Sequence, residues 1–270
     1  MEWSADMKDQ EKLIESVNEL RSYPKYTPTS IIGYKKAREL EPFINFKGNE
    51  SIDFSKADGA IDPKDAISKM INAIKKNGGS VLYPCKFEKI IESNDSYSKI
   101  KTSMGILRSK NIIFCNGVDV DNCFNINFLK KPRPGVIIKT KPKKNLVNSV
   151  VYGPKIHAHQ QSNGQIIIGE QITAPIKENS KNHLKRINGH FKNMFRGAYN
   201  LNPSEVLIGW RPIPKDDLPI IGRFKNKSVY IAVMHSGICL AAIVGNLVTQ
   251  EIVDEVDSTL LNDFRPSRFF

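Results

Sequence analysis

The sequence has few residues of the kinds that form disulfides or metal centres. Its four cysteines, Cys85, Cys115, Cys123 and Cys239, include no CxxC pair. A zinc ribbon and a thioredoxin-type site are therefore not indicated. Each cysteine lies in or beside an apolar run, where a free thiol usually behaves as a small hydrophobic group. We expect reduced cysteines, no metal and a cytoplasmic location.

Long apolar runs are also absent. The longest, residues 237–248, is too short to span a bilayer and contains Asn246. Residues 1–19 are acidic and helical in pattern, which does not resemble a signal peptide. We therefore expect no membrane span.

Arginine is scarce for so basic a chain. Lys plus Arg total 40 against 28 Asp plus Glu, a net charge of +12, but only 10 of the 40 are arginine. Arginine is the residue that binds phosphates and base edges through two parallel hydrogen bonds. Because the lysines are scattered along the chain, we expect no nucleic-acid binding.

Apolar periodicity and turn residues predict a mixed α/β protein. Helices are expected over residues 6–21, 34–40, 63–77, 179–199 and 239–255. Strands are expected over residues 80–83, 86–92, 99–103, 106–108, 111–115, 136–140, 150–152, 156–160, 165–169, 206–210 and 229–232. Residues 43–57 show no period and are expected to form a loop. The apolar stripe of the third helix is expected to be buried; it comprises Ala66, Ile67, Met70, Ile71 and Ile74.

The most informative segment is a strand that runs through a glycine turn into an apolar helix. The strand Val229-Tyr230-Ile231-Ala232-Val233 leads to His235-Ser236-Gly237. A glycine there lets a ligand approach the backbone, and the free N–H groups of the helix start favour negative charge. An ordinary tight turn between strand and helix is the alternative.

A second motif is rich in proline. It reads Gly209-Trp210-Arg211-Pro212-Ile213-Pro214-Lys215-Asp216-Asp217-Leu218-Pro219-Ile220-Ile221-Gly222. Together with residues 235–242 and Phe264-Arg265-Pro266-Ser267-Arg268-Phe269, it resembles the C-terminal part of the FAD-dependent amino-acid oxidoreductases, the D-amino-acid oxidase, glycine oxidase and sarcosine oxidase superfamily. Residues 58–63, the Gly78-Gly79 pair and the run 111–117 are similar to other parts of that family.

The resemblance implies a cofactor, FAD, and a role for each matching residue. It places Arg211 as the clamp for a substrate carboxylate; an ion pair with Asp216 or Asp217 is the alternative. It places the backbone of Gly237 and Ile238 against the flavin.

Further positions follow from the same resemblance. His235 would serve the catalytic site, and Ser236 would line the same turn. Cys239 stands where many relatives carry threonine and Ala242 where they often carry proline, so a hydroxyl that could bond the flavin is missing. Phe87 would meet the adenine through its backbone, or else be a core residue of its hairpin, and Gly117 would lie beside the dinucleotide.

Two histidines, His157 and His159, share one strand face. No further ligand is spaced to complete a metal site with them. One of them could touch substrate in the resembling family; a satisfied or solvent-facing histidine is the alternative.

The family opens with a strand, a GxGxxG turn and a helix that hold the FAD pyrophosphate, and no GxGxxG occurs in this sequence. We therefore expect a Rossmann-like FAD-binding domain that lacks its first unit, in residues 56–85, 104–124 and 204–270. An antiparallel-sheet substrate domain is expected in residues 1–55 and 125–203.

The resemblance implies oxidation of the C–N bond of an amino acid or secondary amine by hydride transfer to flavin. The alternative is a non-catalytic remnant, or one subunit of a split flavoenzyme whose protein partner supplies the missing unit. Neither the substrate nor the choice between oxidase and dehydrogenase can be deduced from these residues.

Overall fold

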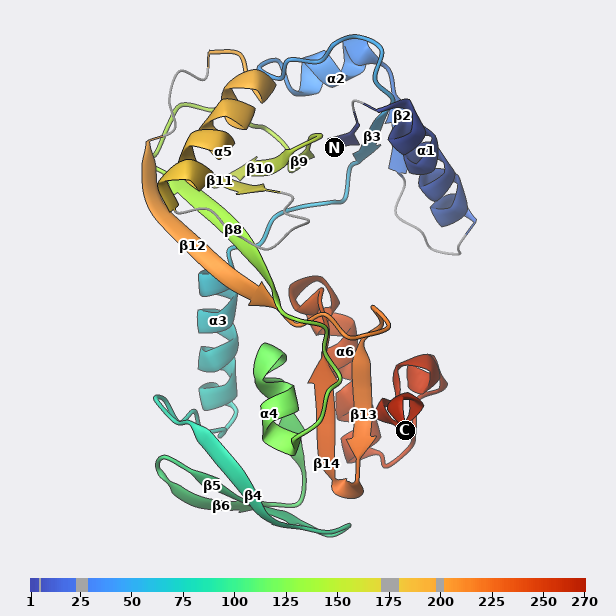
Figure 1. Ribbon diagram of the computed structural model, residues 1–270, viewed down its shortest axis with the longest axis vertical. Coiled ribbons are helices and arrows are strands. Elements are labelled where there is room, and N and C mark those ends of the chain that lie inside the picture. Colours follow the sequence, from blue (N-terminus) through green and yellow to red (C-terminus); the bar gives the residue numbers. More distant parts are fainter. Residues whose placement is uncertain (5, 23–28, 171–179, 198–201) are drawn as a thin grey trace. The chain divides into compact units, whose positions relative to one another are not determined.

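The computed structural model describes residues 1–4, 6–22, 29–170, 180–197 and 202–270 (Figure 1). The chain divides into two compact units, each built from separate stretches of sequence. Unit 1 comprises Met1–Ile61 and Pro134–Gly209, and unit 2 comprises Asp62–Arg133 and Trp210–Phe270. Which unit serves the cofactor and which the substrate stays a prediction.

Unit 1 is built on one large sheet. The strand order is β12-β8-β11-β10-β9-β1-β3-β2, and most of the pairs are antiparallel. The strands are β1 (Glu2–Trp3), β2 (Thr29–Ile32), β3 (Ile52–Ser55), β8 (Arg133–Thr140), β9 (Val151–Tyr152), β10 (Ile156–Gln160), β11 (Ile166–Glu170) and β12 (Pro203–Arg211). The helices are α1 (Met7–Arg21), α2 (Tyr34–Leu40) and α5 (Ser180–Met194).

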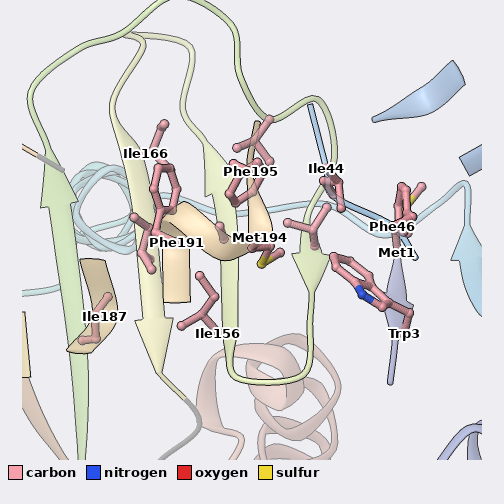
Figure 2. Packing of buried hydrophobic residues seen from close by; sticks show 14 of the residues in the cluster. Met1, Trp3, Ile44, Phe46, Ile156, Ile166, Ile187, Phe191, Met194 and Phe195 are labelled. Atoms are coloured by element: carbon pink, nitrogen blue, oxygen red, sulfur yellow. The ribbon is translucent and has the colours of Figure 1, made fainter. Parts of the chain in front are cut away.

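The core of unit 1 lies between the sheet and α5. Ile187, Phe191 and Met194 of α5 pack with Ile156 and Ile166 of the sheet (Figure 2). Burial of such side chains stabilises the folded state by about 1.5–3 kcal/mol each relative to exposure.

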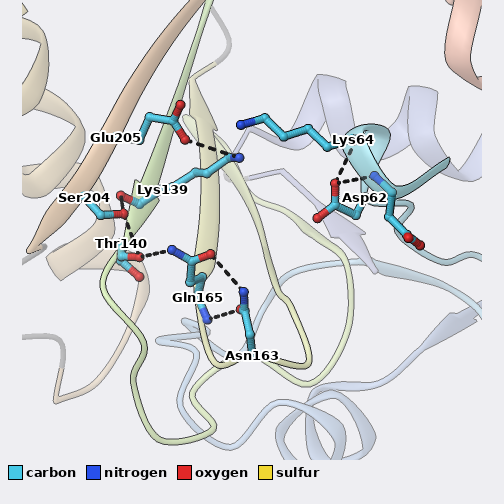
Figure 3. A network of polar contacts seen from close by, with 9 residues as sticks. Asp62, Lys64, Lys139, Thr140, Asn163, Gln165, Ser204 and Glu205 are labelled. Atoms are coloured by element: carbon cyan, nitrogen blue, oxygen red, sulfur yellow. Dashed lines mark hydrogen bonds and ion pairs between the residues drawn. The ribbon is translucent and has the colours of Figure 1, made fainter. Parts of the chain in front are cut away.

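Polar side chains link strand β8 to the strands on either side of it. Lys139 Nζ of β8 lies 3.4 Å from Glu205 Oε2 of β12, and Ser204 donates its hydroxyl hydrogen toward the Thr140 carbonyl at 3.1 Å (Figure 3). Gln165 donates its side-chain amide to the same carbonyl at 3.2 Å. β8 is therefore tied to both of its neighbours.

Unit 2 contains two small sheets. One has the order β13-β14-β7 and the other β4-β5-β6. The strands are β4 (Phe87–Ser93), β5 (Ser98–Thr102), β6 (Gly105–Ser109), β7 (Ile112–Phe114), β13 (Ile220–Phe224) and β14 (Asn226–Val233). The helices are α3 (Pro63–Lys76), α4 (Val120–Phe124) and α6 (Gly237–Val253), with 3-10 turns at Gly117–Asp119, Thr259–Phe264 and Pro266–Phe269.

Local signals explain several of these elements. Asp62 caps α3 by accepting from the backbone N–H of Lys64 at 2.9 Å, as the Asp62-Pro63 pair predicts. Asn94 accepts from the backbone N–H groups of Ser96 and Tyr97, which closes the predicted hairpin of β4 and β5.

Four expectations are wrong. Residues 43–57 contain strand β3, residues 80–83 form no strand, and β1, β2 and β13 were not expected. The apolar stripe of α3 is not buried either: Ile67, Met70 and Ile74 are 52%, 54% and 47% exposed. The apolar periodicity correctly predicts the helix. Burial also requires another element that packs on the apolar face, and no residue of α3 is buried in the described part of the chain. Residues 179 and 198–199 of the predicted fifth helix lie outside the described residues.

Candidate functional site

Two parallel strands of unit 2 end at the same edge of their sheet. β14 pairs with β7 through Val229 with Ile112, Tyr230 with Ile113 and Ile231 with Phe114. Because the strands run in the same direction, the residues that follow them emerge together. In open α/β sheets such a carboxyl edge is where ligands bind.

An open apolar cavity of about 420 Å³ lies along this edge. Gly117 lines it from the turn after β7, Met234 from the turn after β14, and Gly237, Ala241 and Gly245 from α6. The cavity therefore brings together two of the predicted site residues, Gly117 and Gly237. The other residues of the predicted turn, His235, Ser236, Ile238 and Cys239, adjoin Gly237 in sequence and are exposed.

The first turn of α6 carries no side-chain cap. Ser236 occupies the N-cap position without a capping hydrogen bond, and its hydroxyl lies 3.2 Å from His235 Nδ1 instead. The first N–H groups of a helix lack intrahelical partners and carry the positive end of its dipole. This helix start can therefore face an anion or an electron-rich ring edge.

The two glycines leave room for such a group. A Cβ atom at Gly237 would meet no atom within 4 Å. Gly117 has a φ of +60°, a conformation that glycine adopts without strain, and a Cβ there would meet only Pro212 Cγ, at 3.8 Å. A flat ligand can thus approach the backbone at both turns.

Arg211, at the end of β12, is half-buried, and its expected alternative partners are already taken. Asp216 Oδ2 lies 2.6 Å from Arg268 Nε, and Asp217 Oδ2 lies 2.5 Å from Lys130 Nζ. Within the described residues, the Arg211 side chain forms no hydrogen bond or ion pair. The guanidinium is therefore available to a ligand, although it does not line the cavity.

Phe87 lies outside the cavity as well. Its ring packs edge-to-face on Phe114, with the centroids 5.2 Å apart. The side chain is thus part of the hydrophobic core of unit 2. The backbone contact with adenine stays a prediction.

A buried polar cluster behind the turn holds β14 against α6. Tyr230 donates its hydroxyl to Glu251 Oε2 at 2.5 Å, and Arg265 bonds both Glu251 oxygens at 2.5 and 2.8 Å. Burial opposes ionisation of Glu251, but the hydrogen bonds from Arg265 and Tyr230 outweigh it and lower the pKa of this carboxyl. Burial and the bond to Glu251 raise the pKa of Tyr230 well above its usual range.

Neither this cluster nor most of the cavity lining was predicted from the sequence. One signal was readable: Gly237, Ala241, Gly245 and Thr249 recur every fourth residue, so they share one face of α6. All four line the cavity.

In unit 1, His157 lies against a glycine. Its ring stacks on Tyr152 with centroids 5.2 Å apart, and it occupies the space that a Cβ at Gly169 would need. This contact gives His157 a packing role, while a substrate contact of either histidine stays untested.

Residues 3–251 match the family described as FAD dependent oxidoreductase. The chain belongs to this family. The resemblance deduced from the motifs at Arg211 and Gly237 is thereby confirmed, together with the mixed α/β fold.

Curated relatives in this family are distant. The bifunctional protein ThiO/ThiG of Synechocystis sp. is 21% identical over 222 residues, which cover 78% of this chain and 33% of that protein. This chain thus spans about a third of the length of the curated relatives it matches.

Solved structures of other proteins share the fold. L-proline dehydrogenase from P. horikoshii has a TM-score of 0.88 at 19% identity, covering 99% of this chain and 75% of that one. Glycine oxidase from Geobacillus kaustophilus has a TM-score of 0.85 at 16% identity, covering 98% and 73%. No helix in the described part of the chain has the length and apolarity to cross a membrane.

Proposed function

We propose that this chain forms the substrate- and flavin-facing part of an FAD-dependent oxidoreductase that oxidises the C–N bond of an amino acid or secondary amine. The observation that carries the proposal is the half-buried Arg211, which forms no ion pair or hydrogen bond within the described residues. Removing a charge from water is costly unless it is paired. A ligand carboxylate would supply that pair through two parallel hydrogen bonds.

The carboxyl edge of β7 and β14 fits a flavin. Gly117 and Gly237 leave space for a flat ring, and the uncapped start of α6 offers N–H donors and a positive dipole end. The backbone of Gly237, Ile238 and Cys239 would bond the ring edge. Bound FAD would supply the hydride acceptor.

The chain's own residues have the remaining roles. Arg211 holds the carboxylate of the substrate and thereby orients the carbon that bears the amine. His235 and Ser236 line the turn, where their mutual contact positions the imidazole. Phe87 would meet the adenine through its backbone. We assign these roles by family resemblance and by the geometry of the individual residues.

We also propose that a protein partner supplies the nucleotide-binding unit with the GxGxxG turn. The apolar stripe of α3 has no partner within the described residues, and a second polypeptide would cover it. A non-catalytic remnant would not explain why Arg211 forms no ion pair or hydrogen bond within the described residues.

Flavin titration tests the proposal. The purified chain is titrated with FAD, and glycine, sarcosine, proline and a larger amino acid are then added without oxygen. We expect flavin absorbance to bleach with at least one of them in the presence of a GxGxxG-bearing partner segment. If FAD binds and none of the amines bleaches it, the oxidoreductase proposal is wrong.

A further inference from the structure

We propose that unit 1 carries a binding pocket for a phosphate monoester, in addition to the candidate site of unit 2. The pocket has a volume of about 580 Å³, which lies within the roughly 300–1,000 Å³ of small-molecule sites. Four segments line it: β1, the loop at residues 45–50, the turn between β9 and β10, and the end of α5. All four belong to unit 1, so binding here would stand whether or not the chain oxidises an amine.

Three lysines converge on this pocket from segments that are far apart in the sequence. Lys47 comes from the loop, Lys155 from the turn between β9 and β10, and Lys192 from the last turn of α5. None of the three side chains forms an ion pair or hydrogen bond within the described residues. The only carboxylate among the lining residues is that of Glu50, so three positive charges face one negative charge. With His190 neutral, the lining has a net charge of +2, which favours a ligand with two negative charges.

The carboxylate of Glu50 is already engaged by the backbone of its own loop. Its Oε1 accepts a hydrogen bond from the N–H of Lys47 at 2.6 Å, and its Oε2 accepts one from the N–H of Gly48 at 2.8 Å. These bonds fix the loop that presents the Lys47 side chain. The carboxylate therefore orders part of the pocket without forming an ion pair with any of the three lysines.

The turn that carries Lys155 is also held in place. The N–H of Gly153 donates to the carbonyl of Ile156 at 2.9 Å, which closes the turn. A Cβ atom at Gly153 would meet Met194 Sδ at 3.0 Å and Trp3 Cζ2 at 3.1 Å, so the turn packs tightly on these two side chains. Because the backbone is fixed, a ligand has to order only the lysine side chains, which lowers the entropy cost of binding.

The end of α5 is prepared for an anion by Asn45. Free carbonyl groups at the end of a helix carry the negative end of its dipole and would repel an anion. The backbone N–H of Asn45 donates to the Met194 carbonyl at 2.8 Å, and its side-chain amide donates to the Asn193 carbonyl at 3.0 Å. Two of the last carbonyls are thus occupied, and Lys192 adds a positive charge in the same turn.

The lining suits a phosphate monoester better than a carboxylate. It contains no arginine, the residue whose planar fork matches a carboxylate through two parallel hydrogen bonds. Lysine binds phosphate as a compact point charge, and a phosphate monoester carries about −1.5 to −2 at pH 7, close to the opposite of the lining charge. Trp3, Ile156 and Met194 of the unit 1 core also line the pocket and would contact an apolar group attached to the phosphate (Figure 2).

The pocket lies on the face of the sheet that packs against α5. Ile156 of β10 lines it and belongs to the core beneath that helix. Side chains alternate along a strand, so His157 and His159 do not share a face with Ile156: His157 points to the opposite side, and His159 with it. The pocket therefore does not include the two histidines for which a substrate contact was considered.

Trp3 provides a readout inside the pocket. The chain has only two tryptophans, so Trp210→Phe leaves Trp3 as the single one. Phenyl phosphate titrated into this variant should change the Trp3 fluorescence, and calorimetry should give the same dissociation constant. In the same background, Lys155→Gln and Lys192→Gln should each weaken binding about tenfold, because each removes a charged hydrogen-bond donor. Lys185→Gln is the control, since Lys185 is exposed on α5 but does not line the pocket, and it should leave binding unchanged. Circular dichroism verifies that the variants are folded.

Two further ligands test the chemistry of the pocket. Phthalate carries two carboxylates on the same ring, and if it binds as tightly as phenyl phosphate, the pocket is not selective for phosphate and the proposal is wrong. Inorganic phosphate lacks the ring, and equal affinity for it would assign the pocket to free phosphate in place of a monoester. The absence of phenyl phosphate binding by both fluorescence and calorimetry would overturn the proposal. An equal loss in Lys185→Gln and Lys155→Gln would do so as well, since it would show attraction to the overall charge of the chain.

Discussion

Tyr230 donates its hydroxyl to Glu251 at 2.5 Å in the interior of unit 2, which ties the middle of β14 to the end of α6. The Glu251 side chain is fully buried, and Arg265 completes its pairing. The turn that contains His235 and Ser236 lies between these two elements in the chain, and Gly237 begins α6. The position of the candidate site therefore depends on a charge cluster that does not line its cavity.

Breaking this cluster should destabilise unit 2 strongly. Glu251→Ala leaves the Arg265 guanidinium without its carboxylate, and loss of one partner of a buried pair costs about 3–5 kcal/mol. Tyr230→Phe removes one hydrogen bond to a charged acceptor and should cost about 1.5–3 kcal/mol. Urea unfolding of the variants measures both losses. If Glu251→Ala were as mild as Tyr230→Phe, the ion pair would contribute little.

The same carboxyl should make folding sensitive to acid. The folded-state pKa of Glu251 is lowered, as is that of Glu170, where hydrogen bonds from Arg186 outweigh the opposing effect of burial. A lowered pKa stabilises the folded state above the unfolded pKa, near 4.5, and this contribution is lost as pH falls through the folded pKa. We expect the free energy of unfolding to fall below about pH 4.5, and less steeply in Glu251→Gln. If the free energy of unfolding fell equally steeply with pH in the unchanged chain and in Glu251→Gln, Glu251 would not be the source of the acid sensitivity.

The sequence predicted local structure better than burial or pairing. The side-chain hydrogen bonds of Asp62 and Asn94 reach no more than three residues along the chain, so the start of the helix and the turn of the hairpin could be deduced directly. β13 was missed because its Ile220-Ile221-Gly222 core follows a proline-rich run that reads as a loop. The burial of α3 was wrongly predicted because periodicity indicates an apolar face but not what covers it.

In the candidate site, too, the part formed by consecutive residues was predicted and the part formed by residues far apart in the sequence was not. The glycine turn at Gly237 is contiguous in sequence, and its place at a strand–helix junction was predicted. The pairing of Glu251 with Tyr230 and Arg265 joins residues that are 21 and 14 positions apart. No local pattern marks such a cluster, so only the folded arrangement shows it.

Gly169 should be intolerant of any side chain. A methyl group there would overlap the imidazole of His157, so Gly169→Ala should cost about 1–3 kcal/mol of stability. Shortening the opposing side chain should relieve the clash. In a double-mutant cycle, Gly169→Ala combined with His157→Ala should be less destabilising than the sum of the two single changes. Additive losses would show that His157 simply moves aside.

Arg211→Ala should weaken substrate binding without loss of flavin absorbance. A charge-assisted hydrogen bond contributes about 1.5–3 kcal/mol, which corresponds to a loss of roughly 10- to 200-fold in affinity. Calorimetric titration of the FAD-loaded protein with the amine that bleaches it measures this loss. Arg108→Ala is the control, because that exposed guanidinium stacks on Tyr97, with 4.0 Å between its central carbon and the ring centroid. Equal affinities for the two variants would refute the carboxylate clamp.

The exposed stripe of α3 should contribute little to the stability of the chain on its own. Met70→Ser changes a side chain that is 54% exposed, and substitutions at such surface positions usually stay within about 0.5 kcal/mol. Ala37→Ser provides the contrast, since Ala37 is fully buried in the core of unit 1 and a hydroxyl there would need a hydrogen-bond partner. Thermal unfolding should show a marked loss for Ala37→Ser and nearly none for Met70→Ser. A loss of 2 kcal/mol or more at Met70, in the range of about 2–5 kcal/mol that truncation of a buried side chain costs, would mean that α3 is covered in solution by another part of this chain or by a second copy.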